Sequence, residues 1–119
     1  MKVLLVDDEK ELVTTLAERL NLRGLETQWA TSAEDALVRL QTEYFDIAVL
    51  DVKMPKMDGL HLKRQMQERC PTMKFIFVTG HGSSRDFASG ASEVGSDYYL
   101  VKPLKIDELI AKIKEALQR

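Results

Sequence analysis

Short apolar segments alternate with amphipathic segments along the whole chain. Strand-like segments cover residues 2–6, 25–30, 47–51, 73–78 and 98–101. Four of them are compact apolar runs, which are typical of strands buried on both faces of a parallel sheet, and residues 25–30 alternate instead. A helix-like pattern follows each segment, so the sequence predicts five successive strand–helix units.

The predicted helices have apolar positions three or four residues apart. The first is marked by Leu12, Val13, Leu16, Ala17 and Leu20 and the last by Ile106, Leu109, Ile110, Ile113 and Leu117. Gly24 stands where a residue past a helix end is expected. The sequence Thr31-Ser32-Ala33-Glu34 has the spacing of a capping box, which predicts that the second helix begins there.

Two further helices are predicted in the second half of the chain. Leu60, Leu62 and Met66 mark the third helix, which should end before Pro71. The fourth, over residues 83–95, is rich in serine and holds Gly90 in its interior. Because an interior glycine costs a helix about 1 kcal/mol relative to alanine, this helix should be short and weakly held.

The alternation of strands and helices predicts an α/β fold, with a parallel sheet covered on both faces and right-handed crossovers. The 119 residues, of which 45% are hydrophobic and 30% charged, fit one globular domain over residues 1–119. A net charge of −2 favours neither nucleic acid nor a membrane surface as the direct partner. The single cysteine, Cys70, excludes an internal disulfide and suits the cytoplasm.

Polar residues interrupt four of the predicted strands at their carboxyl ends. They are Asp7 and Asp8, Asp51, Thr79, and Lys102. Each has an ordinary structural explanation by itself, since an aspartate can cap a helix and a lysine can be solvated. In a parallel sheet, however, these strand ends lie along one edge, which is where open α/β sheets bind ligands.

Three clustered carboxylates repel one another unless a cation compensates their charge. Mg²⁺ suits such a site, because it prefers oxygen ligands and commonly binds one or two carboxylates together with phosphate oxygens. A carboxylate is also a nucleophile toward phosphoryl groups, and Lys102 would add positive charge. We therefore expect phosphoryl chemistry at Asp51.

These residues carry a family resemblance. The chain resembles the receiver domain of two-component response regulators in Val6-Asp7-Asp8-Glu9, Leu50 to Pro55 with Asp58-Gly59, Val78-Thr79-Gly80, and Gly95 to Pro103. The resemblance implies a flavodoxin-like (βα)5 doubly wound fold with strand order 2-1-3-4-5. It also implies a cytoplasmic signalling protein rather than a turnover enzyme.

The resemblance implies a role for each matching position. Asp51 would accept a phosphoryl group from a sensor histidine kinase, and Mg²⁺ or Mn²⁺ would be held by Asp7, Asp8, Asp51 and the backbone carbonyl of Lys53. Lys102 would pair with the phosphoryl group. Thr79 and Tyr99 would form the switch, and the Lys102–Pro103 bond would be cis.

Some positions affect the expected properties rather than the chemistry. Lys53 and His81 each lie two residues beyond a key position, where receivers tune the lifetime of the phosphoryl group. His61 and His81 are expected to face solvent. Lys63 stands where the third helix would ordinarily bury an apolar residue, which predicts looser packing there.

The expected output is a changed surface on the fourth helix, fifth strand and fifth helix. That surface would control a fused or separate output domain, or a homodimer. Three other functions fit parts of the sequence: an aspartate-nucleophile phosphatase, a flavin-binding module, and a docking module that works unphosphorylated. The first usually has its nucleophile after the first strand, and Asp7-Asp8-Glu9 would repel a flavin phosphate.

Overall fold

The computed structural model describes residues 1–54, 59–80 and 98–118. The elements, in chain order, are β1 (Lys2–Val6), α1 (Lys10–Leu22), β2 (Glu26–Ala30), α2 (Ala33–Arg39), β3 (Ile47–Asp51), α3 (Gly59–Arg69), β4 (Lys74–Gly80), β5 (Tyr99–Lys102) and α5 (Ile106–Leu117). The helix predicted over residues 83–95 and His81 lie outside the described residues. Within those ranges no helix is long and apolar enough to cross a lipid bilayer.

The five strands form one parallel sheet in the order β2-β1-β3-β4-β5. The strand β3 lies at its centre, and all five of its residues are buried. The predicted fold class and strand order are therefore confirmed. Because all strands are parallel, the carboxyl ends of β1, β3, β4 and β5 lie side by side at the same end of the sheet.

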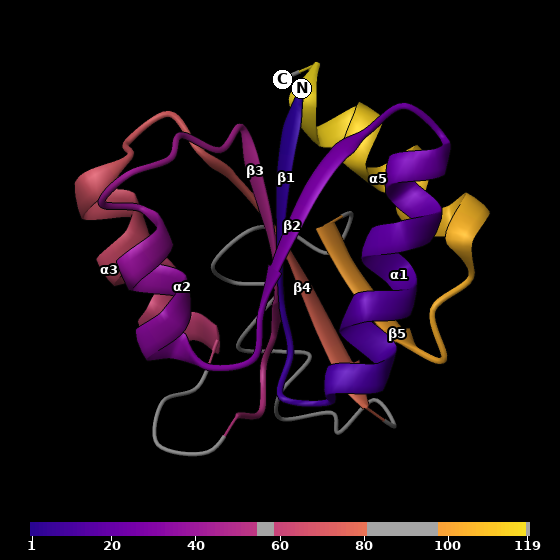
Figure 1. Ribbon diagram of the computed structural model, residues 1–119, viewed down its shortest axis with the longest axis horizontal. Helices are drawn as coiled ribbons and strands as arrows, with labels where there is room; N and C mark the ends of the chain where they lie inside the picture. Colours follow the sequence, from indigo (N-terminus) through magenta and orange to yellow (C-terminus); the bar gives the residue numbers. More distant parts are fainter. Residues whose placement is uncertain (55–58, 81–97, 119) are drawn as a thin grey trace.

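Two hydrophobic cores lie on opposite faces of the sheet. Helices α2 and α3 cover one face, and α1 and α5 cover the other (Figure 1). Phe45, Leu62 and Phe77 are fully buried on the first face, and Leu20 and Ile113 are fully buried on the second. Alternate residues of each strand enter alternate cores, which explains why the strands read as nearly continuous apolar runs.

The helix ends correct one prediction. Gly24 has a φ of +87° just beyond α1, as expected of a residue that follows a helix. The capping residue of α2, however, is Ser32 and not Thr31. Its side chain accepts a hydrogen bond of 3.0 Å from the backbone N–H of Asp35, because the first helical residue is Ala33. The capping-box spacing thus located this helix one residue too early.

Lys63 is buried in α3, with only 9% of its surface exposed. Its ammonium lies 6.0 Å from the centre of the Phe75 ring, a cation–π distance. The neighbouring helix positions Leu62 and Met66 are fully buried. The prediction of looser packing at Lys63 is therefore wrong. The aliphatic part of a lysine can pack in a core while its ammonium contacts an aromatic face.

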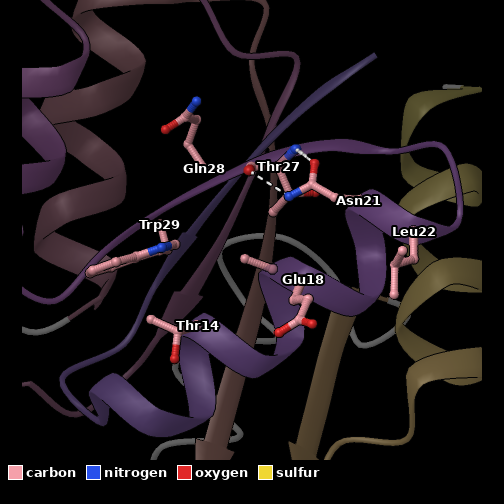
Figure 2. Close-up of a pocket in the computed structure, with 8 residues that line it drawn as sticks. Thr14, Glu18, Asn21, Leu22, Thr27, Gln28 and Trp29 are labelled. Atoms are coloured by element: carbon pink, nitrogen blue, oxygen red, sulfur yellow. Dashed lines mark hydrogen bonds between the residues drawn. The ribbon is translucent and has the colours of Figure 1, made fainter.

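The outer edge of β2 is closed by a side chain. The carboxamide of Asn21 accepts a 2.8 Å hydrogen bond from the backbone N–H of Thr27 and donates one of 3.1 Å to the carbonyl of Thr27 (Figure 2). Since β2 ends the sheet in the part of the chain that is described, these backbone groups face no strand. Asn21 thus takes the place that a peptide group of a further strand would occupy.

Candidate functional site

The sheet topology brings four of the predicted residues together: Asp7, Asp8, Asp51 and Lys102. Asp7 directly follows β1, Asp51 ends β3, and Lys102 ends β5. Val6 pairs with Leu50 across β1 and β3, so Asp7 and Asp51 extend from neighbouring positions of neighbouring strands. Residues that lie 44 and 95 positions apart from Asp7 therefore meet at one edge, as expected for the carboxyl end of an α/β sheet.

The acidic side chains form a compact cluster. One carboxylate oxygen from each of Asp7, Asp8 and Asp51 lies within 4.8 Å of the others. Asp7 and Asp51 are 8% and 6% exposed, whereas Asp8 is exposed. The ammonium of Lys102 lies 2.9 Å from Asp7 Oδ2 and 3.6 Å from Asp51 Oδ2. The cluster thus holds a buried pair of carboxylates, one carboxylate open to solvent and a lysine.

The backbone around Asp51 is held from two sides. The N–H of Lys53 donates a 3.2 Å hydrogen bond to Asp51 Oδ1, and the N–H of Gly59 donates one of 2.9 Å to the carbonyl of Val52. A Cβ atom at Gly59 would lie 2.5 Å from the backbone oxygen of Asp51, which is too close for any other residue to fit unchanged. Gly59 therefore helps to position Asp51. In the sequence, the Asp58-Gly59 pair indicated only a turn.

Thr79 and Tyr99 are both buried. Thr79 is 1% exposed, and its hydroxyl donates a long 3.4 Å hydrogen bond to the carbonyl of Gly80. Tyr99 is buried with its ring edge-on to Phe77, at 6.3 Å between centroids. Phe77 and Tyr99 both belong to the core under α2 and α3. By strand alternation Thr79 points toward this same face, whereas Asp51 points toward the face of α1 and α5.

The pKa of the Asp51 carboxyl is raised by its surroundings. Burial raises the pKa of its carboxyl from 3.8 to about 6, and the charge of Asp7 adds to the rise. Lys102 and the Lys53 N–H favour the ionised form and lower the pKa in part. For Lys102, burial lowers the pKa, but hydrogen bonds to Asp7 and Glu9 outweigh it and raise the pKa overall. Lys102 therefore stays charged, whereas the negative charge on Asp51 is only partly compensated.

The donor set fits a hard divalent cation. Three carboxylates offer oxygen ligands within reach of one ion, and such ligands are those that Mg²⁺ prefers. Burial and the charge of Asp7 disfavour the ionised form of Asp51, and a cation bound beside it would favour that form. The residues present are thus consistent with the predicted metal site.

A pocket of about 590 Å³ opens over this cluster. Its polar lining comes from Asp8, Glu9, Asp51, Lys53 and Lys102, and Leu12, Pro103 and Leu104 form an apolar wall. The Lys102–Pro103 peptide bond, where this wall begins, is cis. Sequence reasoning assigned no role to Glu9, although its position in an acidic run after β1 was the available signal. Its carboxylate lies 3.0 Å from the ammonium of Lys102.

The predicted residue His61 lies outside this pocket. His61 is exposed on α3, as predicted, and its ring lies 3.4 Å from the side-chain nitrogen of Gln65. His81, whose predicted role is to tune the phosphoryl lifetime, is not among the described residues. Lys53 lines the pocket with an exposed side chain, and its tuning role stays a prediction.

Several curated relatives of the chain are named as transcription regulators. The chain is 35% identical over 118 residues to the alkaline phosphatase synthesis transcriptional regulatory protein PhoP of Bacillus subtilis, covering 99% of this chain and 49% of that protein. It is 38% identical over 118 residues to the transcriptional regulatory protein CpxR of Klebsiella pneumoniae, covering 99% of this chain and 50% of CpxR. The chain thus spans about half the length of the curated relatives it matches.

Solved structures similar to this chain include a response regulator receiver domain. A CheY-like response regulator receiver domain from Methanospirillum hungatei superposes with a TM-score of 0.87 at 32% identity, covering 98% of this chain and 93% of that one. The amino-terminal FixJ structure gives 0.85 at 28% identity, covering 99% and 94%. The response regulator receiver domain family matches residues 3–114. With its sheet order, its acidic cluster and these relatives, the chain belongs to the receiver domain family of two-component response regulators.

Proposed function

We propose that the chain is a phosphorylation-controlled switch in which Asp51 accepts a phosphoryl group from a sensor histidine kinase. The observation that carries this proposal is the setting of Asp51: a buried carboxylate at a strand end, beside two further carboxylates and one lysine. Carboxylates are effective nucleophiles toward phosphorus when charge is neutralised around the transferred group. The site offers both the nucleophile and the neutralising groups.

In the proposed reaction, a carboxylate oxygen of Asp51 attacks the phosphorus of a phosphohistidine. A P–O bond forms, the P–N bond breaks, and the electron pair leaves with the imidazole, which takes up a proton. Hydrolysis later restores the carboxylate when water attacks the phosphorus and inorganic phosphate leaves. Because the phosphoryl group itself is the signal and its hydrolysis resets Asp51, we expect a switch rather than a turnover enzyme.

The surrounding residues position the reacting groups. The Lys53 N–H orients one oxygen of Asp51, and Lys102 stays charged beside the other, where it can pair with the incoming phosphoryl oxygens. Asp7, Asp8, Asp51 and the carbonyl of Lys53 would hold Mg²⁺ or Mn²⁺, which supplies positive charge to the phosphoryl oxygens when bound. Gly59 allows the close approach of α3 to the Asp51 backbone.

The proposed output is a shift between two conformations. A phosphoryl group adds about −1.5 to −2 charge and three acceptor oxygens at this edge of the sheet. We expect Thr79 to move toward it and Tyr99 to follow, which alters the surface formed by the predicted fourth helix, β5 and α5. The relatives are named as transcription regulators and are about twice as long, so we expect an output domain, fused or separate, or a homodimer, to be controlled through this surface.

Intact-mass analysis after incubation with acetyl phosphate and Mg²⁺ tests the proposal. We expect one phosphoryl adduct on the native protein, none on Asp51→Asn, and a much lower yield with a chelator present. Asp46→Asn is the matched control, because Asp46 precedes the opposite end of the same strand, β3, and should keep the adduct. An adduct on Asp51→Asn, or none on the native protein, would contradict the proposal.

A further inference from the structure

Lys102 is shared among three carboxylates. Its ammonium lies 2.9 Å from Asp7 Oδ2, 3.0 Å from Glu9 Oε1 and 3.6 Å from Asp51 Oδ2. It therefore lies nearer to Glu9 than to the proposed phosphoacceptor. The three partners also differ in exposure, because the side chain of Glu9 is 63% exposed whereas those of Asp7 and Asp51 are 11% and 7% exposed. Glu9 is thus the partner of Lys102 on the solvent side.

Glu9 occupies a position where a side chain ordinarily caps the helix that follows. It is the N-cap residue of α1, yet its side chain makes no capping hydrogen bond. Serine, threonine, aspartate and asparagine are the effective capping residues at such a position, and their side chains accept a hydrogen bond from the first turn. Here the carboxylate reaches Lys102 instead. A local preference that is broken beside a site is a signal of function.

We propose that Glu9 is a positioning residue that binds the Lys102 ammonium on its solvent side in the unphosphorylated protein and competes with the phosphoryl group for that ammonium. This inference rests on the proposed function of Asp51. A phosphoryl group carries more negative charge than a carboxylate and offers three acceptor oxygens, so it draws Lys102 from Glu9 once it is attached. Glu9 thereby sets how readily the site accepts a phosphoryl group.

Glu9 also acts on the approaching donor. It lines the same pocket as Asp8, Asp51 and Lys102, so its charge repels an anionic phosphodonor at the entrance. Glutamine at this position keeps an oxygen acceptor and the side-chain length but removes the charge. We expect Glu9→Gln to phosphorylate from acetyl phosphate about two- to fivefold faster, the range for loss of one charge at several ångströms in a solvated site.

The kinetic test compares the native chain with Glu9→Gln and Glu11→Gln, using acetyl phosphate and Mg²⁺. Glu11 is an exposed glutamate in the first turn of α1, so its variant makes the same charge change on the same helix. Each variant is repeated in a Lys102→Met background. We expect Glu9→Gln to exceed Glu11→Gln by a larger factor where Lys102 is present, because without Lys102 only the repulsion of the phosphodonor is removed. Equal rates for Glu9→Gln and the native chain, or an equal gain without Lys102, would overturn the inference.

A second readout needs neither metal nor phosphodonor. In chelator, the side-chain amine resonance of Lys102, assigned by its loss in Lys102→Met, should shift in Glu9→Gln and stay in place in Glu11→Gln. An unmoved resonance would overturn the inference even if the adduct forms at Asp51. Conversely, a shifted resonance with no adduct in any variant would overturn the proposed function while the contact between Glu9 and Lys102 stands.

Discussion

Each end of the sheet has a lysine surrounded by acidic residues, but the electrostatic consequences differ. At the carboxyl end, Asp7, Asp8, Glu9 and Asp51 gather near Lys102. At the amino end, Lys2 meets three acidic residues: its ammonium lies 3.0 Å from Glu43 and 3.5 Å from Glu26, and its backbone N–H donates a 2.7 Å hydrogen bond to Asp46. Arg39 adds a second cation, 3.8 Å from Glu43.

The pKa values of Lys2 and Asp51 rise for opposite reasons. The hydrogen bond with Glu43 raises the pKa of Lys2, which means that the charged form is stabilised. Burial and the charge of Asp7 raise the pKa of Asp51, which means that its charged form is destabilised. At the amino end, the charged form of Lys2 is thus stabilised by its neighbours. At the carboxyl end, the charged form of Asp51 is destabilised, and a bound cation would relieve this and leave Asp51 ionised for phosphotransfer.

Gly59→Ala is the change with the largest expected effect. The new Cβ would meet the backbone oxygen of Asp51 at 2.5 Å, so α3 or the Asp51 strand must shift. We expect a loss of about 2–3 kcal/mol in the free energy of unfolding, typical of overpacking, together with slower phosphorylation. Urea denaturation and acetyl phosphate kinetics measure the two effects.

Gly24→Ala is the control for Gly59→Ala. Gly24 lies near the amino end of β2 with a φ of +87°, and nothing lies within 4 Å of the added Cβ. It should lose stability through backbone strain, by about 1 kcal/mol, and phosphorylate at the native rate. If Gly59→Ala behaved like this control, the close support of Asp51 by α3 would be disproved.

Asp51→Asn should make the protein more stable at neutral pH. Because the pKa of Asp51 is about 6 in the folded protein and 3.8 ordinarily, the folded state binds more protons between these values, and stability falls as pH rises through this window. The amide does not titrate and removes this penalty. We expect a gain of about 1–2 kcal/mol near pH 7.5 that disappears near pH 4, measured by denaturant unfolding across pH in chelator.

Asp46→Ala at the amino end is the matched contrast. Asp46 accepts the Lys2 N–H, so its loss should cost about 1 kcal/mol at neutral pH. A loss of stability in Asp51→Asn, or a gain in Asp46→Ala, would remove the difference between the two ends of the sheet.

Asn21→Ala tests how the amino-end region satisfies its polar groups. Two hydrogen bonds to the Thr27 backbone are lost, and the edge of β2 is uncovered. We expect a cost of about 1 kcal/mol and self-association at high protein concentration, since an open strand edge can pair with another chain. Sedimentation velocity measures the association. Asn21→Asp, which keeps the acceptor for the Thr27 N–H, should associate less, and equal behaviour of the two variants would contradict the role of the carboxamide.

Glu26→Gln should have the smallest effect. Glu26 pairs with Lys2 at 3.5 Å, but its side chain is 67% exposed. Exposed ion pairs contribute little, so we expect a change within about 0.5 kcal/mol and an unchanged phosphorylation rate. Thermal unfolding at low and high salt measures the stability change. A loss comparable with that of Asp46→Ala would mean that the amino-end charges act as one coupled network.

The sequence by itself determined the order and type of most elements. Apolar runs such as residues 73–78, and the helical spacing of Leu109 and Ile113, follow from the burial that each element requires, and burial depends on local periodicity. The same logic located Asp7, Asp51 and Lys102, because a charged residue cannot continue a strand that is buried on both faces. The strand order came from the family resemblance and not from periodicity.

Only the tertiary structure decided which partners the site residues have. The contact of Glu9 with Lys102, the close approach of Gly59 to Asp51 and the capping of β2 by Asn21 all join positions whose distance depends on how the strands and helices pack. The pKa of Asp51 likewise depends on burial beneath neighbouring elements and on the charge of Asp7, which arrives from another strand. Local patterns carry no information on such distances, because they are set by the three-dimensional arrangement of the whole sheet.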